Sequence, residues 1–291
     1  MIDRLYDKTS KILFSTYGDD FLKYFGEYKN IIRELGTEVH TLYGSHRRLD
    51  RLALVDDNTL QNWEFEVKDI NDDTLSRIWE YNNLKSAEIG AIMDSFIISF
   101  ANPDSCKETV EIGRSIVFAP MIKYLQKMGL PKKLNTIEEK VNDNKKITVH
   151  DELTLIFVTL SVKDSSKEKM LKRVCSVLKK IDYIAEYRRV VIDSLISFQI
   201  ENFVKTKEEQ DKLNEVVCMQ MSVEELFVQT EREYVFDSGY DQGIKKGKGE
   251  REDEIIMNML ENSFDDELIV KATNCSREHL QELKTRYLAS K

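Results

Sequence analysis

Three acidic side chains and one lysine in the first quarter of the chain have the types and spacing to cleave a phosphodiester. Asp50 stands apart, and Glu64, Glu66 and Lys68 follow at alternate positions, which strand alternation would place on one face. Carboxylates on neighbouring strands are the hard oxygen ligands of Mg²⁺ or Mn²⁺. We therefore expect Asp50 and Glu64 to bind the metal, and Glu66 or Lys68 to place the attacking water.

Two questions about this pattern stay open from spacing alone. The second carboxylate and the third polar group are either Glu64 and Glu66, or Glu66 and Lys68. Trp63 and Phe65 occupy the alternate positions, so the acidic residues could equally form the solvated face of a half-exposed strand.

The elements that must position these residues form an expected antiparallel hairpin. The run 48–55 is short and rich in Leu and Val, and residues 60–68 alternate between apolar and charged side chains. The Asp56-Asp57-Asn58 sequence between them is typical of a turn. Residues 37–43 also alternate.

The flanking segments indicate an α/β fold. Helical spacing predicts helices over 3–24 and 28–35, the second ending at Gly36. A helix is also expected over 72–88, capped by Asp72 or Asp73, and β-rich apolar runs follow at 92–100 and 115–118.

The segment RRLDRLALVDDNTLQNWEFEV, followed by LSRIWEYNNL, resembles the PD-(D/E)XK nucleases of the transposase type, also called recombination-promoting nucleases. Asp50 matches the family aspartate, Glu64 its glutamate, and Arg77 and Tyr81 a pair on the next helix; an acidic residue in an early helix, like Asp7, also fits. The resemblance implies a restriction-endonuclease-like core with a central mixed sheet, metal-dependent DNA cleavage, and contact of Arg77 and Tyr81 with the substrate.

One position departs from the family pattern, because Glu66 stands where the family has glutamine. The added charge could strengthen metal binding, or it could repel the scissile phosphate, in which case Lys68 would have to place the water. Three clustered carboxylates repel one another, so we expect a raised pKa for at least one of them in the absence of metal.

The sequence as a whole predicts that the chain is divided into four regions. Residues 1–147 would form the nuclease-like core, and residues 148–235, where neither proline nor glycine occurs up to Tyr234, a helical extension packed on it. Residues 236–250 would be a Gly/Lys-rich linker or a helix with a glycine stripe, and residues 251–291 a small helical tail.

The tail offers further expectations. Helical pieces should follow Asp265-Asp266 and Ser276, with a helix-turn-helix-like hairpin around Asn274-Cys275. The glycines at 239, 243 and 247 and this final hairpin resemble the tail of the same family, and the C-terminal helices could join copies of the chain into a homo-oligomer.

Composition bounds the alternatives. No apolar run approaches the roughly 18 residues of a membrane helix. The start MIDRLYDKTSKILF does not look like a signal peptide. Because four scattered cysteines also favour a reducing compartment, we expect a cytoplasmic location. The net charge of −9 counts against a nucleic-acid partner. A catalytically inactive relative that binds DNA or assembles, and a helical scaffold for protein partners, therefore stand beside the nuclease hypothesis.

Overall fold

The computed structural model describes residues 2–40, 46–181, 183–217 and 221–230 of a first compact unit, Met1–Tyr234. In a second unit, Val235–Lys291, it describes residues 255–257, 259, 265–273, 276–277, 280–281 and 283–284. The expected glycine-rich segment 236–250 and the turn at Asn274-Cys275 lie outside the described residues.

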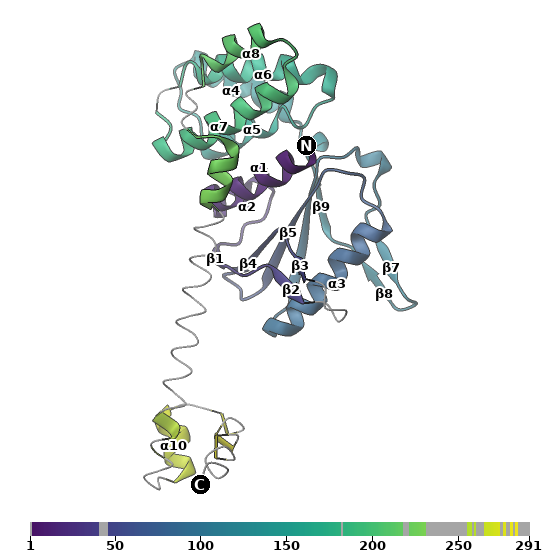
Figure 1. The fold of residues 1–291 in the computed structure, drawn as a ribbon, viewed down its shortest axis with the longest axis vertical. Coiled ribbons are helices and arrows are strands. Elements are labelled where there is room, and N and C mark those ends of the chain that lie inside the picture. The colour runs from purple at the N-terminus through teal and green to yellow at the C-terminus, as the bar shows by residue number, and fades with distance from the viewer. Residues whose placement is uncertain are drawn as a thin grey trace. The chain divides into compact units, whose positions relative to one another are not determined.

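The first unit is an α/β structure built on a five-stranded mixed sheet (Figure 1). Its strands, in spatial order, are β1 (Ile31–Glu34), β4 (Arg51–Val55), β5 (Leu60–Glu66), β6 (Met93–Ser99) and β9 (Met121–Tyr124). β1, β4 and β5 are antiparallel neighbours, whereas β5, β6 and β9 run parallel. The α/β class and the mixed sheet expected from the sequence are thus present.

The β4–β5 hairpin forms as its sequence predicts. Asn58 takes a positive φ of 64° in the turn, a conformation that Asn tolerates better than most residues. Asp57 Oδ1 accepts hydrogen bonds from the backbone N–H and the hydroxyl of Thr59, at 3.1 and 2.6 Å. The turn therefore fixes the register that brings Arg51 opposite Trp63.

The expected helix over 28–35 is wrong, because Ile31–Glu34 is strand β1. Two adjacent β-branched residues, Ile31 and Ile32, favour a strand, and pairing with β4 outweighs the helical spacing. Asp19 Oδ1 accepts a hydrogen bond from the N–H of Ile31 at 2.6 Å, which anchors the entry to this strand.

Two other helices differ in detail from expectation. The stretch 3–24 is two helices, α1 (Ile2–Tyr17) and α2 (Asp19–Tyr24), separated at Gly18 with φ 49°. Helix α3 (Asp72–Ile89) is capped by Asn71 rather than by Asp72 or Asp73, since the Asn71 side chain accepts a hydrogen bond from the N–H of Thr74.

Small hairpins and helices complete the first unit. The hairpins pair β2 (Glu38–His40) with β3 (His46–Arg48), and β7 (Val110–Ile112) with β8 (Ile116–Phe118); 3₁₀ turns cover Pro103–Ser105 and Leu125–Lys127. The helices are α4 (Leu130–Asn142), α5 (Val149–Phe157), α6 (Asp164–Leu178), α7 (Glu186–Phe203), α8 (Lys207–Asn214) and residues 223–230. The helical character expected beyond residue 148 is confirmed for the described residues.

The two faces of the sheet have different cores. Trp63, Phe65 and Phe96 pack on the face toward α1 and α2, where the Trp63 and Phe96 rings stack with centroids 4.3 Å apart. α1 contacts both β5 and α7, so it lies between the sheet and the helices α4–α8 (Figure 1). α3 covers the opposite face through smaller apolar clusters that include Leu75 and Ile78.

The second unit contains helix α10 (Asp266–Thr273), which confirms the helix expected after Asp265-Asp266. Ile256, Ile269, Leu280 and Leu283 form a buried apolar cluster. Leu280 N–H donates to the carbonyl of Ser276 at 3.1 Å, as a helix beginning there would require. Among the described residues of the whole chain, no helix has the length and apolar character to cross a bilayer.

Candidate active site

The register of the β4–β5 hairpin brings Asp50 next to Glu64. Asp50 directly precedes Arg51, which pairs with Trp63, so it lies opposite the following residue of β5. Its N–H donates to Glu64 Oε1 at 3.4 Å, and its carboxylate Oδ2 accepts from the N–H of Phe65 at 3.0 Å. Two acidic residues that are distant in sequence thus meet at one end of the hairpin.

Strand alternation separates polar from apolar side chains along β5. Trp63 and Phe65 belong to the large core cluster, while Glu64 is buried and Glu66 partly buried on the face toward α3. β5 ends at Glu66, so Lys68 lies beyond the paired strand with an exposed side chain. The structure therefore groups Asp50 with Glu64 and Glu66 more closely than with Lys68.

Glu64 is the most perturbed carboxyl group of this site. Its residue is 5% exposed, and burial raises its pKa from 4.5 to about 8, with the nearby charge of Asp50 adding to the shift. Asn62 and Arg77 oppose the shift, and Glu66 adds to it. Glu64 therefore retains its proton at neutral pH unless a further cation offsets the charge of its neighbours.

Two cations from different helices touch the acidic group. Lys11 Nζ, from α1, lies 3.0 Å from Asp50 Oδ1, and the two side chains are 14% and 21% exposed. Arg77 Nη2, from α3, lies 2.5 Å from Glu66 Oε1, with the arginine side chain 48% exposed. The site thus combines three carboxyl groups with the enclosed positive charge of Lys11 and the half-exposed one of Arg77.

A buried polar network continues the site between β5 and α3. Asn62 Nδ2 donates to Asn82 Oδ1 at 2.8 Å, and Asn82 Nδ2 donates in turn to the hydroxyl of Ser95 on β6. All three side chains are buried. This network stabilises the packing of α3 on the sheet beside Glu64, because breaking it would leave buried donors and acceptors without partners.

The other two residues expected to contact substrate differ in position. Arg77 lies on α3 beside Glu66, as described. Tyr81, one turn later, is 7% exposed and packs in a small core cluster with Leu49, Leu52 and Leu60. Its contact with substrate stays a prediction. Asp7 belongs to α1, and its side chain lies outside the described ones.

The donor chemistry of the site fits a hard divalent cation. Asp50 and Glu64 supply carboxylate oxygens, and Mg²⁺ is commonly held by one or two carboxylates together with water and substrate phosphate. Within the part of the chain that the structure describes, no three or more His, Cys, Asp or Glu side chains are arranged to hold a metal on their own. Asp50 and Glu64 are the two residues that could hold one here, with substrate and water completing the shell.

Sequence reasoning missed Lys11, Asn62, Asn82 and Ser95. Nothing in the spacing of Lys11 within an amphipathic helix indicates that it lies beside Asp50. The asparagines and the serine carry no motif, although Asn62 does belong to the alternating polar positions of β5. The register of β5 and β6 brings Ser95 beside Asn62. Lys11 and Asn82 join the site through the packing of α1 and α3 on opposite sides of the hairpin.

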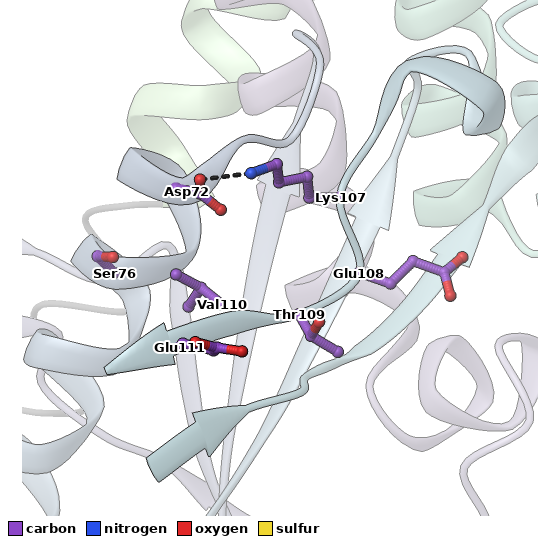
Figure 2. Close-up of a pocket in the computed structure, with 7 residues that line it drawn as sticks. All are labelled: Asp72, Ser76, Lys107, Glu108, Thr109, Val110 and Glu111. Carbon is purple, nitrogen blue, oxygen red and sulfur yellow. Dashed lines mark hydrogen bonds and ion pairs between the residues drawn. The ribbon is translucent and has the colours of Figure 1, made fainter. Parts of the chain in front are cut away.

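A pocket of about 580 Å³ lies elsewhere on α3, at its N-terminal end (Figure 2). It is lined by Asp72, Ser76, Lys107, Glu108, Thr109, Val110 and Glu111. Lys107 and Asp72 form an ion pair at its rim, and both side chains are more than half exposed. Asp50, Glu64 and Glu66 are not among the lining residues, so this pocket is separate from the acidic site.

Comparisons with family models, with curated proteins and with solved structures found no match to this chain. The interpretation of the acidic site therefore depends on its own geometry and on the short motifs in the sequence.

Proposed function

We propose that the chain is a Mg²⁺- or Mn²⁺-dependent DNA endonuclease of the PD-(D/E)XK transposase or recombination-promoting type, with a restriction-endonuclease-like core. The observation that carries the proposal is the meeting of Asp50 and Glu64 across the β4–β5 hairpin, with Asp50 held by the Phe65 N–H at 3.0 Å. The order of an antiparallel hairpin followed by two parallel strands, with α3 joining β5 to β6, supports it.

In this proposal Asp50 and Glu64 hold the cation. When bound, the metal supplies positive charge that polarises the scissile phosphate and offsets the charge developing on it. The raised pKa of Glu64 supports the assignment, because a carboxyl group that is buried beside another carboxylate is poised to exchange its proton for a cation.

Glu66 or Lys68 places the attacking water. Glu66 lies on the same face of β5 as Glu64 and is held by Arg77, which would keep its carboxylate oriented and partly neutralised. Lys68 has an exposed side chain two residues beyond the end of β5. Arg77, half exposed, could also contact a DNA phosphate, and the partner would be DNA despite the net charge of −9.

The test is cleavage of supercoiled plasmid DNA by the purified chain, with Mg²⁺, with Mn²⁺ and with EDTA. We expect nicked or linear product with a divalent cation only, and Asp50→Asn to reduce product to the EDTA level. Glu80→Gln on the exposed side of α3 is the matched control, and it should cut like the wild type. Cleavage that persists in Asp50→Asn would contradict the proposal.

A second candidate is a catalytically inactive protein of the same fold that acts in DNA binding or assembly. The ion pairs Lys11–Asp50 and Arg77–Glu66 favour it, because a self-neutralised acidic cluster can serve stability alone. The separate second unit could then mediate assembly between copies. Metal-independent DNA binding without cleavage, or oligomers that are lost when the chain is truncated after Tyr234, would favour this candidate over the nuclease.

A further inference from the structure

We propose that Lys11 is the catalytic cation of the acidic site and acts on the scissile phosphate beside Asp50. This inference rests on the proposed nuclease function and assigns to helix α1 a role that the sequence pattern offered only to Lys68. It starts from the 3.0 Å contact between Lys11 Nζ and Asp50 Oδ1.

The surroundings of Lys11 hold its ammonium group at the metal-binding carboxylate. Its side chain is 14% exposed, against 48% for Arg77, so it is the more enclosed of the two cations paired with the acidic group. An enclosed charge acts through a lower effective dielectric and is screened less by salt. Lys11 is therefore the stronger electrostatic partner for charge that develops at this point.

The packing of helix α1 fixes the position of Lys11. The next three residues, 12–14, are fully buried, and Arg51 Nη2 donates to the Lys11 carbonyl at 3.4 Å. At the end of the helix, Tyr17 donates to Glu152 Oε2 of α5 at 3.2 Å. A charge on a regular, packed element is positioned more closely than one on a loop, which is what stabilisation of a transition state requires.

Pairing with Lys11 leaves Asp50 able to bind a metal. One carboxylate oxygen accepts from Phe65 N–H and the other faces Lys11 Nζ. Because an ionised carboxylate offers about four lone-pair directions, each oxygen keeps one for a further partner. Lys11 can thus stay beside Asp50 while its positive charge acts on a phosphate oxygen bound at the same carboxylate.

The reaction balances without any co-reactant besides water. The oxygen of water forms a bond to phosphorus while one phosphorus–oxygen ester bond breaks. The water gives up a proton to solvent, and the departing alkoxide takes one up. Lys11 stays protonated throughout and stabilises the negative charge on the non-bridging oxygens, which rises in the transition state.

The experiment compares Lys11→Met, Lys11→Arg and Lys8→Met in plasmid cleavage with Mn²⁺. Lys8 lies on the same helix and pairs with Glu224, away from the acidic group, so it is the matched control. We expect Lys11→Met to lower kcat by about 10²- to 10³-fold with KM nearly unchanged. Lys11→Arg should recover part of the rate, and Lys8→Met should cut like the wild type.

The outcomes separate the two proposals. A wild type that cuts DNA, loses activity in Asp50→Asn and keeps full kcat in Lys11→Met would overturn the role of Lys11 alone. A wild type that cuts in neither Mg²⁺ nor Mn²⁺ would overturn both. Thermal unfolding of each variant shows whether it is folded. If Lys11→Met does not fold, the cleavage rate of Lys11→Gln tests the role of Lys11 instead. A folded Lys11→Gln at full rate would overturn the proposal, and a rate lowered as in Lys11→Met would support it.

Discussion

Asp50 and Glu64 lie across from each other at the end of the β4–β5 hairpin, where the backbone N–H of Asp50 donates to the carboxyl group of Glu64 at 3.4 Å. Burial, together with the charge of Asp50, raises the pKa of Glu64 to about 8. Measurable consequences follow from this relationship, for the stability of the fold as well as for metal binding.

Glu64→Gln should flatten the dependence of stability on pH. Because the pKa of Glu64 is raised in the folded state, its stabilising contribution is complete below about 4.5 and is lost as pH rises toward 8. Glutamine resembles the protonated form at every pH, so the variant should exceed the wild type in free energy of unfolding at pH 9, by an amount on the order of a few kcal/mol. Urea unfolding from pH 5 to pH 9 measures this difference. Parallel curves for the two proteins would contradict the assignment.

Divalent-cation affinity should rise with pH and reach a plateau near pH 8. A cation bound between Asp50 and Glu64 must displace the proton of Glu64, so binding below that pH releases protons. Calorimetric titration with Mn²⁺ in two buffers of different ionisation enthalpy counts the protons released. We expect up to one proton per Mn²⁺ at pH 6.5 and close to none at pH 9, and a count that does not change with pH would argue against Glu64 as a ligand.

Arg77→Met should change the pKa of Glu64 more than it changes the free energy of unfolding. The arginine side chain is half exposed, so its ion pair with Glu66 is worth less than about 1 kcal/mol. Its charge nevertheless lowers the pKa of Glu64, so its loss should move the plateau of Mn²⁺ affinity to higher pH. Lys107→Met is the matched control, because it removes another exposed ion pair of α3, with Asp72. An equal effect of both variants on the pH at which Mn²⁺ affinity levels off would contradict a direct effect of the Arg77 charge on Glu64.

Asn82→Ala should destabilise the fold by about 1–3 kcal/mol, because Asn62 Nδ2 and Ser95 Oγ would lose their buried partner. Asn83→Ala, at the neighbouring exposed position, removes only a hydrogen bond to the Trp79 carbonyl and should stay within about 0.5 kcal/mol of the wild type. Urea unfolding at pH 7 compares the two variants. Similar losses of unfolding free energy in both variants would contradict a specific contribution of the Asn62–Asn82–Ser95 network to stability.

The predictability of the fold from sequence depended on how local each signal was. Alternation in β5 and the turn chemistry at residues 56–58 are local, and the hairpin is confirmed. The helix expected over 28–35 is wrong because the pairing of β1 with β4, not the spacing of its own residues, decides the conformation of Ile31–Glu34. The cap of α3 shows the same limit on a smaller scale, since Asn71, Asp72 and Asp73 are all good capping residues and backbone geometry selects the first.

The candidate site was predictable where it lies on one hairpin. Asp50, Glu64 and Glu66 could be grouped from strand alternation and an assumed register. Lys11 could not, because its place beside Asp50 depends on how α1 packs between the sheet and α7. The exposed position of Lys68 likewise follows from where pairing with β6 stops, which the alternating pattern does not reveal.

We propose that Asp50 and Glu64 share one divalent cation. Anomalous diffraction from crystals soaked in Mn²⁺ at pH 8 tests it most directly. We predict a single strong peak at about 2 Å from a carboxylate oxygen of each residue, and its loss in Asp50→Asn. A peak bound elsewhere, or no peak between these two carboxylates at saturating Mn²⁺, would contradict it.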